Sequence, residues 1–369
     1  MSWAIWITGL PGSGKSLLAR RAAQALAELN ERVVVLELDE IRKTLTPAPT
    51  YSDAERDLVY RALVYMAVEL TEAGVPVIID ATGHRRAWRD LARASIRRFA
   101  EVQLDCPLEV CRERERRRTG GHAPRGIYAR AGAPGAAVPG VDVPYEPAFA
   151  PELTLDTAAG EPGAAAARIV ELARSFAESG GRPEAAPAVS WAIWITGLPG
   201  SGKSTLAWRV ADVLAARGIT VRVLELEAVR GFLCAGRPES ELAREIIHRA
   251  VGYTAKLLTE AGVSAIVAAT APRRAWREMA RGLVVRFAEV QLVCPRELCI
   301  ERERAARWQL GGRAPVQAPA RAAAPPDLAL DYEHSLRPEL ILHTDVQDLW
   351  RAVEDVVRLV NRLRHREAP

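Results

Sequence analysis

The stretch WAIWITGLPGSGKS spans residues 3–16, and the identical stretch returns at residues 191–204. Each copy carries the pattern G-x-x-x-x-G-K-S between an apolar run and a run with apolar residues at helical spacing. A glycine-rich loop between a strand and a helix turns backbone N–H groups and the positive end of the helix toward phosphate oxygens. The sequence therefore predicts two nucleoside-triphosphate-binding units in tandem.

The repeat extends far beyond this loop. RRAWR at residues 85–89 returns at 273–277, which sets the offset between the copies at 188 residues. A unit of this length can bury a core of its own. We therefore expect two domains, residues 1–179 and 189–369, joined by a linker at residues 180–188.

Strand-like apolar runs alternate with helix-like runs along each copy. In the first copy we expect strands at residues 3–8, 33–37, 75–79, 101–105 and 153–155, and helices at 15–29, 53–72, 86–99, 108–118 and 164–177. This alternation predicts an α/β fold in each domain: a three-layer α/β/α P-loop domain with a parallel sheet and the ligand at the carboxyl ends of the strands. Residues 119–147, rich in Gly, Pro and Ala, predict a functional lid, which is simpler at 311–326 in the second copy.

The charge balance and the apolar runs exclude several classes of protein. The chain has 50 basic and 46 acidic residues, interspersed, which does not indicate a nucleic-acid or membrane binder. No apolar run reaches the ~18 residues of a membrane span. The first apolar run leads straight into the phosphate loop and therefore does not read as a signal peptide. We expect a cytoplasmic protein and leave a homo-oligomer open.

Cysteines, lone histidines and tryptophans are predicted to have no part in chemistry. A five-residue step between paired cysteines is not a zinc spacing, so small buried thiols in a reduced cytosol are expected. His84 and His122 are isolated and expected to be exposed. The cysteines are Cys106, Cys111, Cys234, Cys294 and Cys299. The tryptophans expected in the core are Trp3, Trp6 and Trp88 with their counterparts in the second copy.

The phosphate site supplies the first set of predicted functional residues. Lys15 can reach the β- and γ-phosphates of ATP, and the hydroxyls of Ser16 and Ser204 can ligate Mg²⁺. ATP and Mg²⁺ are therefore the expected cofactors. The predicted ATP-binding residues are Gly9, Leu10, Pro11, Gly12, Ser13, Gly14, Lys15 and Ser16, with Gly197, Leu198, Pro199, Gly200, Ser201, Gly202, Lys203 and Ser204.

Two carboxylates follow predicted strands and can serve the transfer of a phosphoryl group. Asp39 can hold a Mg²⁺ water or orient the attacking hydroxyl, and is predicted to be catalytic and metal-binding. The alternative for Asp39 is a helix N-cap, since it precedes a helix-like segment. Asp80 can hold Mg²⁺ through water, with a structural cap as its alternative.

Beyond the loop, almost all of residues 3–178 resembles adenylylsulfate (APS) kinases. ELDEIR at 37–42 corresponds to that family's Asp-Gly-Asp-x-x-Arg, and YSDAER at 51–56 to its Phe-Ser-Asp-x-x-Arg. GIYARA at 126–131 and GVDVPYE at 140–146 look like its lid. These lid motifs are more specific than the phosphate loop, because most small-molecule kinases of this fold lack them.

The resemblance implies transfer of the γ-phosphoryl group of ATP to the 3′-hydroxyl of APS, giving PAPS. It implies catalytic roles for Lys15, Asp39 and Arg114. The acceptor-binding residues that it implies are Arg42, Arg56, Arg61, Arg130 and Val138. Arginine suits an anionic acceptor because its guanidinium grips phosphate or sulfate with two hydrogen bonds.

The chain departs from the family pattern on the acceptor side. Val59 stands where the family has Asn, Val138 where it has a stacking Phe, and residues 80–86 differ from its Ser-Phe-Ile-Ser-Pro-x-Arg. Residues 116–124 look like an insertion. Two alternatives therefore stay open: a kinase of this fold for another small molecule, and a nucleotide-sensing regulatory protein without transfer activity.

The second copy keeps the phosphate loop but has lost other parts. Glu227 replaces Asp39, Ala268 replaces Asp80, and the Gly-Ile-Tyr lid segment has no counterpart. The arginines that it keeps are Arg230, Arg244, Arg249 and Arg302. A carboxylate displaced by about 1 Å can cost on the order of 10²-fold in rate. We therefore expect the second copy to bind nucleotide and to be poorly equipped for transfer.

Overall fold

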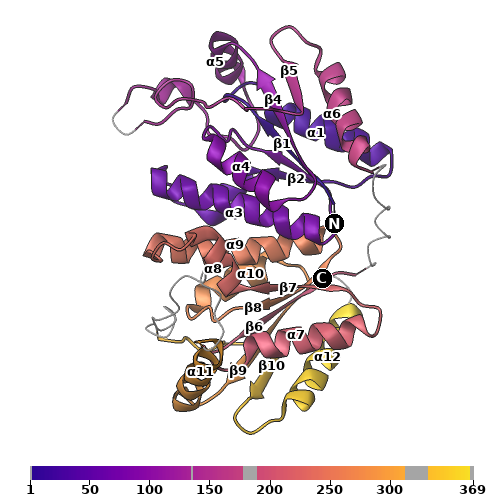
Figure 1. Cartoon of the computed structure of the whole chain (residues 1–369), viewed down its shortest axis with the longest axis vertical. Coiled ribbons are helices and arrows are strands. Elements are labelled where there is room, and N and C mark those ends of the chain that lie inside the picture. Colours follow the sequence, from indigo (N-terminus) through magenta and orange to yellow (C-terminus); the bar gives the residue numbers. More distant parts are fainter. Residues whose placement is uncertain (1, 134–135, 178–188, 312–330, 366–369) are drawn as a thin grey trace. The chain divides into compact units, whose positions relative to one another are not determined.

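The computed structural model describes residues 2–133, 136–177, 189–311 and 331–365, in which two compact units are found, Met1–Ala185 and Ala186–Pro369 (Figure 1). The expected linker at 180–188 falls wholly outside the described residues. Each unit has the same architecture and is described by itself.

The first unit is built on a parallel sheet of five strands in the order β2-β3-β1-β4-β5. The central strand β1 is fully buried, as its continuous apolar sequence predicts for a parallel strand covered on both faces. The strands are β1 (Ala4–Thr8), β2 (Val34–Glu37), β3 (Val77–Asp80), β4 (Phe99–Asp105) and β5 (Leu153–Asp156).

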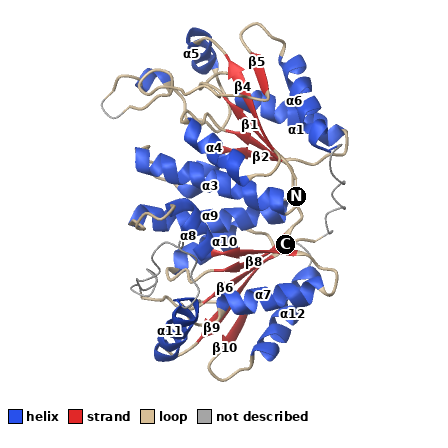
Figure 2. Ribbon diagram, viewed as in Figure 1, coloured by secondary structure: helices blue, strands red, loops and turns tan. Residues whose placement is uncertain are grey.

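Helices cover both faces of this sheet, with α1 and α6 on one face and α3 and α4 on the other (Figure 2). Tryptophans expected in the core are there, with Trp6 fully buried, and all five cysteines are buried, as expected. The helices are α1 (Lys15–Glu28), α2 (Leu38–Leu45), α3 (Asp53–Glu72), α4 (Arg86–Ser95), α5 (Leu108–Arg117), the 3₁₀ turn η1 (Tyr128–Arg130) and α6 (Pro162–Ala177).

The second unit repeats the topology, with the strand order β10-β9-β6-β8-β7. Its strands are β6 (Ala192–Thr196), β7 (Val221–Glu225), β8 (Ser264–Ala268), β9 (Phe287–Val293) and β10 (Leu340–His343). Its helices are α7 (Lys203–Ala215), α8 (Leu226–Cys234), α9 (Glu241–Glu260), α10 (Arg274–Leu283), α11 (Arg296–Gly311) and α12 (Leu349–His365). The predicted fold class, two α/β domains with parallel sheets, is confirmed.

One predicted boundary is wrong. The helix expected over 86–99 ends at Ser95, because Ile96 turns to an extended backbone with φ −112° and ψ 118°. Phe99 then pairs with Ala4 as the first residue of β4. Helical periodicity continues through this segment in the sequence, and pairing with the central strand overrides it.

The register of the sheet places the carboxyl ends of β1, β2 and β3 side by side. Glu37 of β2 and Ile7 of β1 both lie opposite Asp80 of β3. Because the strands are parallel, their carboxyl ends share one edge with the phosphate loop that follows β1. The site is therefore built at this edge.

Candidate active site

The phosphate loop has a backbone that only glycine adopts without strain. Gly9, Gly12 and Gly14 have φ of 153°, 82° and 101°. A Cβ atom on Gly12 would also lie 2.3 Å from the carbonyl oxygen of Cys111 in α5. The loop of the second copy has the same three positive-φ glycines. Both loops therefore hold the conformation that cradles phosphates.

Lys15 opens α1 and folds back over the loop. Its Nζ donates hydrogen bonds to the carbonyl oxygens of Gly9, at 3.1 Å, and Leu10, at 2.9 Å. Burial lowers the pKa of Lys15, while the nearby carboxylates of Asp80 and Asp39 act to raise it. The side chain is thus held at the mouth of the loop, among carbonyl and carboxylate oxygens.

A carboxyl group faces this lysine from the end of β3. Asp80 is 5% exposed, and burial raises its pKa to about 6 despite the opposing charge of Lys15 and a hydrogen bond with Ser16. Glu37 and Asp39 add negative charge nearby, which also acts to raise the pKa of Asp80. Lysine, hydroxyl and carboxylate groups therefore converge beside the loop.

This arrangement fits ATP and Mg²⁺ on the chemistry of its donors. The Ser13 hydroxyl is buried and has no hydrogen-bond partner among the described residues, and Lys15 is buried without a salt bridge there. Both would gain from phosphate oxygens. Ser16, Asp80 and Asp39 supply the hard oxygen ligands that Mg²⁺ prefers.

The cap alternative for Asp39 is wrong. The helix that follows β2 begins at Leu38, so Asp39 lies in its first turn and Glu37 is the N-cap residue. An acidic side chain in the first turn is favourable because it faces the positive end of the helix. The metal and catalytic roles of Asp39 stay predictions.

Two acceptor-side arginines, one on α2 and one on α3, both contact Tyr51. Arg42 is buried, pairs with Glu55 at 3.3 Å, and lies over the ring of Tyr51 at 5.4 Å. Arg56 donates to the carbonyl oxygen of Tyr51 and to that of Ala137 in the lid, both at 2.9 Å. Arg56 therefore joins α3 to the lid beside Arg42.

The other predicted acceptor residues have contacts or surroundings of their own. Arg61 pairs with Asp57 one turn earlier on α3 at 3.0 Å, and Asp57 also accepts a hydrogen bond from Trp88. Arg130 is exposed on η1. Val138 is buried inside the lid, where it offers no ring for stacking. The structure thus brings Arg42 and Arg56 together at Tyr51, and Arg56 also reaches Ala137, the neighbour of Val138.

Arg114 supports the phosphate loop indirectly, through Thr157. It donates to the carbonyl oxygen of Thr157 at 2.6 Å, and the Thr157 hydroxyl donates to the carbonyl oxygen of Ser13 at 2.9 Å. Arg302 makes the same bond to Thr344 in the second copy, at 2.9 Å. The predicted catalytic role of Arg114 stays a prediction, and its observed contacts are those of a support.

The first part of the lid is fixed to both the loop and α5. The Tyr128 hydroxyl donates to the carbonyl oxygen of Pro11 at 2.7 Å. The buried carboxylate of Glu115 accepts from the backbone N–H groups of Gly126, at 2.8 Å, and Ile127, at 3.2 Å. These contacts hold the lid over the phosphate loop.

The last part of the lid is tied to the residue before the loop. Thr8 Oγ1 donates to the carbonyl oxygen of Thr82 at 2.7 Å, so the Tyr145 hydroxyl donates to Thr8 at 2.9 Å. Tyr332 and Thr196 repeat this contact in the second copy at 3.0 Å. The sequence patterns did not predict this anchor.

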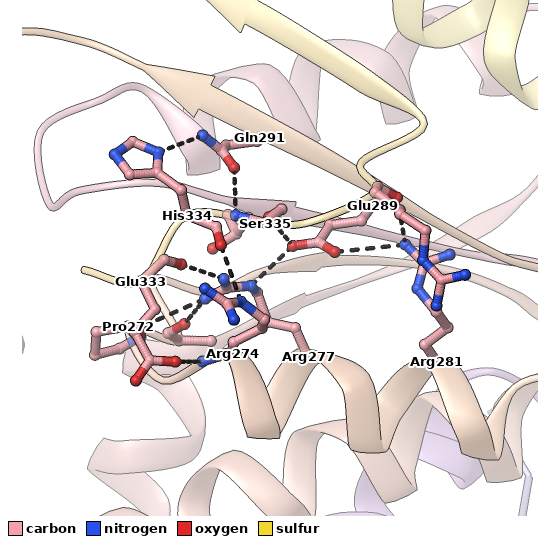
Figure 3. Close-up of polar contacts among 12 residues, drawn as sticks. Pro272, Arg274, Arg277, Arg281, Glu289, Gln291, Glu333, His334 and Ser335 are labelled. Carbon is pink, nitrogen blue, oxygen red and sulfur yellow. Dashed lines mark hydrogen bonds and ion pairs between the residues drawn. The ribbon is translucent and has the colours of Figure 1, made fainter.

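A buried arginine holds each anchor in place. Figure 3 shows Arg277 reaching Glu289 at 2.8 Å and also donating to the carbonyl oxygen of Glu333, next to the anchoring tyrosine. In the first copy Arg89 pairs with Glu101 at 2.5 Å in the same way. Both arginines are fully buried. Their signal in the sequence was the RRAWR repeat, whose last residue is this arginine.

One expectation about the histidines is wrong. His84 is only 3% exposed and packs edge-on against Trp88. Burial, with the charges of Arg56 and Arg85, lowers its pKa to about 4. His122 is exposed as expected. A lone histidine in a loop gives no sequence signal for burial by a segment that follows much later.

The second copy keeps the loop and anchor but not the carboxylate at the end of its third strand. Ala268 stands there, buried, and Glu227 lies in the first turn of α8. The lid predicted at 311–326 begins at the end of α11 and otherwise lies outside the described residues. Only the first copy therefore combines a lysine, a buried carboxylate and a described lid.

A five-stranded parallel sheet, a phosphate loop after its central strand and acidic side chains at the ends of β2 and β3 define the class of P-loop kinases. The family model for adenylylsulphate kinase matches residues 1–156 and 189–314, which is most of the chain. The protein belongs to this family.

Individual relatives agree. A probable adenylyl-sulfate kinase of Archaeoglobus fulgidus is 37% identical over 158 residues, 42% of this chain and 97% of the relative. An adenylyl-sulfate kinase of Synechococcus is 39% identical over 156 residues, 42% of this chain and 84% of the relative.

Solved structures are also similar. An APS kinase of Mycobacterium tuberculosis, in complex with AMPPNP and APS, has 31% identity and a TM-score of 0.42, and covers 47% of this chain and 98% of its own.

Among the described residues, no helix is long and apolar enough to cross a membrane.

Proposed function

We propose that residues 1–179 phosphorylate the 3′-hydroxyl of adenylylsulfate with ATP, giving PAPS. Membership of the APS kinase family supports the reaction. The observation that carries its assignment to the first copy is the buried Asp80, which faces Lys15 and bonds Ser16 where the second copy has Ala268.

The residues divide the task between charge and position. Lys15 turns from the loop carbonyls to the β- and γ-phosphates, and the loop N–H groups hold the same oxygens. Ser16, with Asp80 and Asp39 through water, would hold Mg²⁺, which neutralises phosphate charge when bound. Asp39 orients the attacking hydroxyl, and Arg42 and Arg56 grip the anionic acceptor.

The lid excludes water from the transferring group. Its contacts with Pro11 and Thr8 hold it against the loop in the described structure. Water exclusion strengthens the electrostatic interactions in the site and prevents hydrolysis of ATP. The protein works in the cytoplasm with small-molecule substrates, and residues 189–369 form a second nucleotide-binding unit that has diverged.

Measuring ADP release with and without adenylylsulfate tests this function. We expect ADP release in the presence of Mg²⁺ to be stimulated by adenylylsulfate, with one PAPS formed for each ADP. Stimulation by a different acceptor alone would make the protein a kinase of this fold for another molecule. No stimulation by any acceptor would leave a nucleotide-binding regulator.

A further inference from the structure

The second copy places a carboxylate between its two acceptor-side arginines. Glu239 Oε1 lies 2.8 Å from Nε of Arg244, and its Oε2 forms an ion pair with Arg230. The Glu239 side chain is only 6% exposed. One buried acidic group thus binds both guanidinium groups at once.

The first copy has no carboxylate at the corresponding position. By the offset of 188 residues, Arg230 and Arg244 correspond to Arg42 and Arg56, and Glu239 corresponds to Tyr51. The ring of Tyr51 lies against Arg42, with a left-handed backbone of φ 55°. A neutral ring therefore stands where the second copy has a negative charge.

The carboxylate has moved between the copies. In the first copy Glu55 pairs with Arg42, and also accepts hydrogen bonds from the backbone N–H groups of Thr50, at 2.6 Å, and Tyr51, at 3.2 Å. In the second copy its counterpart is Ala243. The Glu55 carboxylate is therefore held by the backbone just before α3 and pairs with one arginine, whereas Glu239 pairs with two.

This move changes the charge that an incoming anion meets. Among the described residues Arg56 forms no ion pair with a carboxylate, and its hydrogen bonds go to neutral carbonyl oxygens. Arg244 pairs with both Glu239, at 2.8 Å, and Glu241, at 2.7 Å. An anion at Arg244 would have to displace a buried carboxylate, which is costly.

We infer that Glu239 occupies the anion subsite of the second copy from within, and that the exchange of Tyr51 for Glu239 decides which copy accepts an anionic substrate. The position of this subsite rests on the proposed function. The second copy would then bind nucleotide at its phosphate loop while excluding sulfate and phosphate groups from its acceptor side.

Thermal unfolding of the full chain in sulfate, against chloride at matched ionic strength, tests this inference. An Arg56→Ala background removes the subsite of the first copy. In that background we expect Glu239→Gln to melt lower in chloride and to regain about 3 °C or more in sulfate, because the anion replaces the lost carboxylate. Sulfate at the two phosphate loops should stabilise the parent and the variant alike, so the 3 °C is counted beyond the gain of the parent.

Glu241→Gln is the matched control, because it removes the same charge and also frees a donor of Arg244 but leaves Glu239 in place. A sulfate response of equal size in this control, or in the parent, would overturn the inference. If Glu239→Gln does not fold, Glu239→Tyr with Ala243→Glu restores the arrangement of the first copy. That double variant should also gain the sulfate response, and its absence would count equally against the inference.

The reverse exchange gives a second readout. Tyr51→Glu with Glu55→Ala should raise KM for adenylylsulfate at least ~10²-fold while the Kd for ATP stays within about twofold, because the moved carboxylate would pair with both acceptor-side arginines and leave the phosphate loop unchanged. An unchanged KM would refute the role of this position. If the wild-type chain does not turn over adenylylsulfate, the proposed function fails, and the sulfate experiment still decides the inference.

Discussion

Asp39 follows β2 and Asp80 ends the neighbouring strand β3, but the two carboxylates differ in their surroundings. Asp80 is buried against Lys15 and Ser16, so its position is fixed by the loop that it faces. Asp39 is half-buried in the first turn of α2 and lies closer to the acceptor-side arginine Arg42 along that helix. We therefore expect Asp80 to hold Mg²⁺ through water. We expect Asp39 to orient the attacking hydroxyl and to hold a water of the metal.

Replacing Asp39 tests this division at the scale of one residue. Asp39→Asn should leave the affinity for ATP nearly unchanged and reduce the turnover of adenylylsulfate at least ~10²-fold, because its negative charge acts mainly in the transition state. Steady-state kinetics and a fluorescent ATP analogue measure the two effects. Near-normal turnover would leave Asp39 with a structural role only.

The buried imidazole of His84 is expected to make the stability of the protein depend on pH. Its folded pKa of about 4 lies below the ordinary value of 6.5, so the folded state holds the imidazole neutral. That stability is present above pH 6.5 and is lost as the pH falls toward 4. His84→Gln should therefore reduce the loss of stability between pH 7 and pH 4.5 by about 1–3 kcal/mol.

Urea unfolding of the wild type and of His84→Gln at the two pH values measures this difference. The second copy has Pro272 at the corresponding position and contributes no such group. Parallel pH dependence in the two proteins would show that His84 titrates at its ordinary pKa in the folded state.

At the scale of an element, the lid is held at both of its ends. Tyr128 binds the loop carbonyl of Pro11, and Tyr145 binds Thr8 at the end of β1. Arg89 fixes the backbone beside Tyr145 through a fully buried side chain. The lid is thus coupled to the strand from which the phosphate loop starts, and its position and the loop's position depend on each other.

A matched pair of tyrosine variants tests this coupling. Tyr145→Phe removes only the hydroxyl that donates to Thr8, so turnover of adenylylsulfate should fall about 2- to 10-fold, the worth of one hydrogen bond. Tyr332→Phe removes the same contact in the second copy and should leave turnover unchanged. Equal losses in the two variants would contradict a catalytic first copy with a coupled lid.

At the scale of the whole molecule, one architecture serves two unequal sites. Both units have the loop, the buried arginine and the tyrosine anchor. They differ at Asp80 and Ala268, and in where the acidic group beside the arginines stands. These differences lie at the metal and the acceptor, so nucleotide binding and transfer are expected to separate between the units.

The two loop lysines give the test of this asymmetry. Lys15→Ala should abolish ADP formation that depends on adenylylsulfate, whereas Lys203→Ala should leave most of it, because both lysines serve phosphates but only the first has Asp80 beside it. Titration with a fluorescent ATP analogue should show two sites in the wild type and one in each variant. Equal, additive halving of activity would mean two independent active sites.

Much of the fold and the phosphate site could be predicted because their signals are local. The spacing in GLPGSGKS and the alternation of strands and helices depend on neighbouring residues, and both predictions of fold were confirmed. The predictions that failed depend on contacts between residues that are far apart in the sequence. The end of α4 depends on pairing with β1, and the burial of His84 depends on packing by a segment near Glu146.

By itself, the sequence determined the duplication, the order of the elements, the two phosphate loops and the family to which the chain belongs. The tertiary structure alone decided which side chains meet: Asp80 with Lys15, Tyr145 with Thr8, and Glu239 with two arginines. The physical reason is that a loop motif fixes its own backbone, whereas an ion pair or a buried hydroxyl depends on strand register and packing between distant segments.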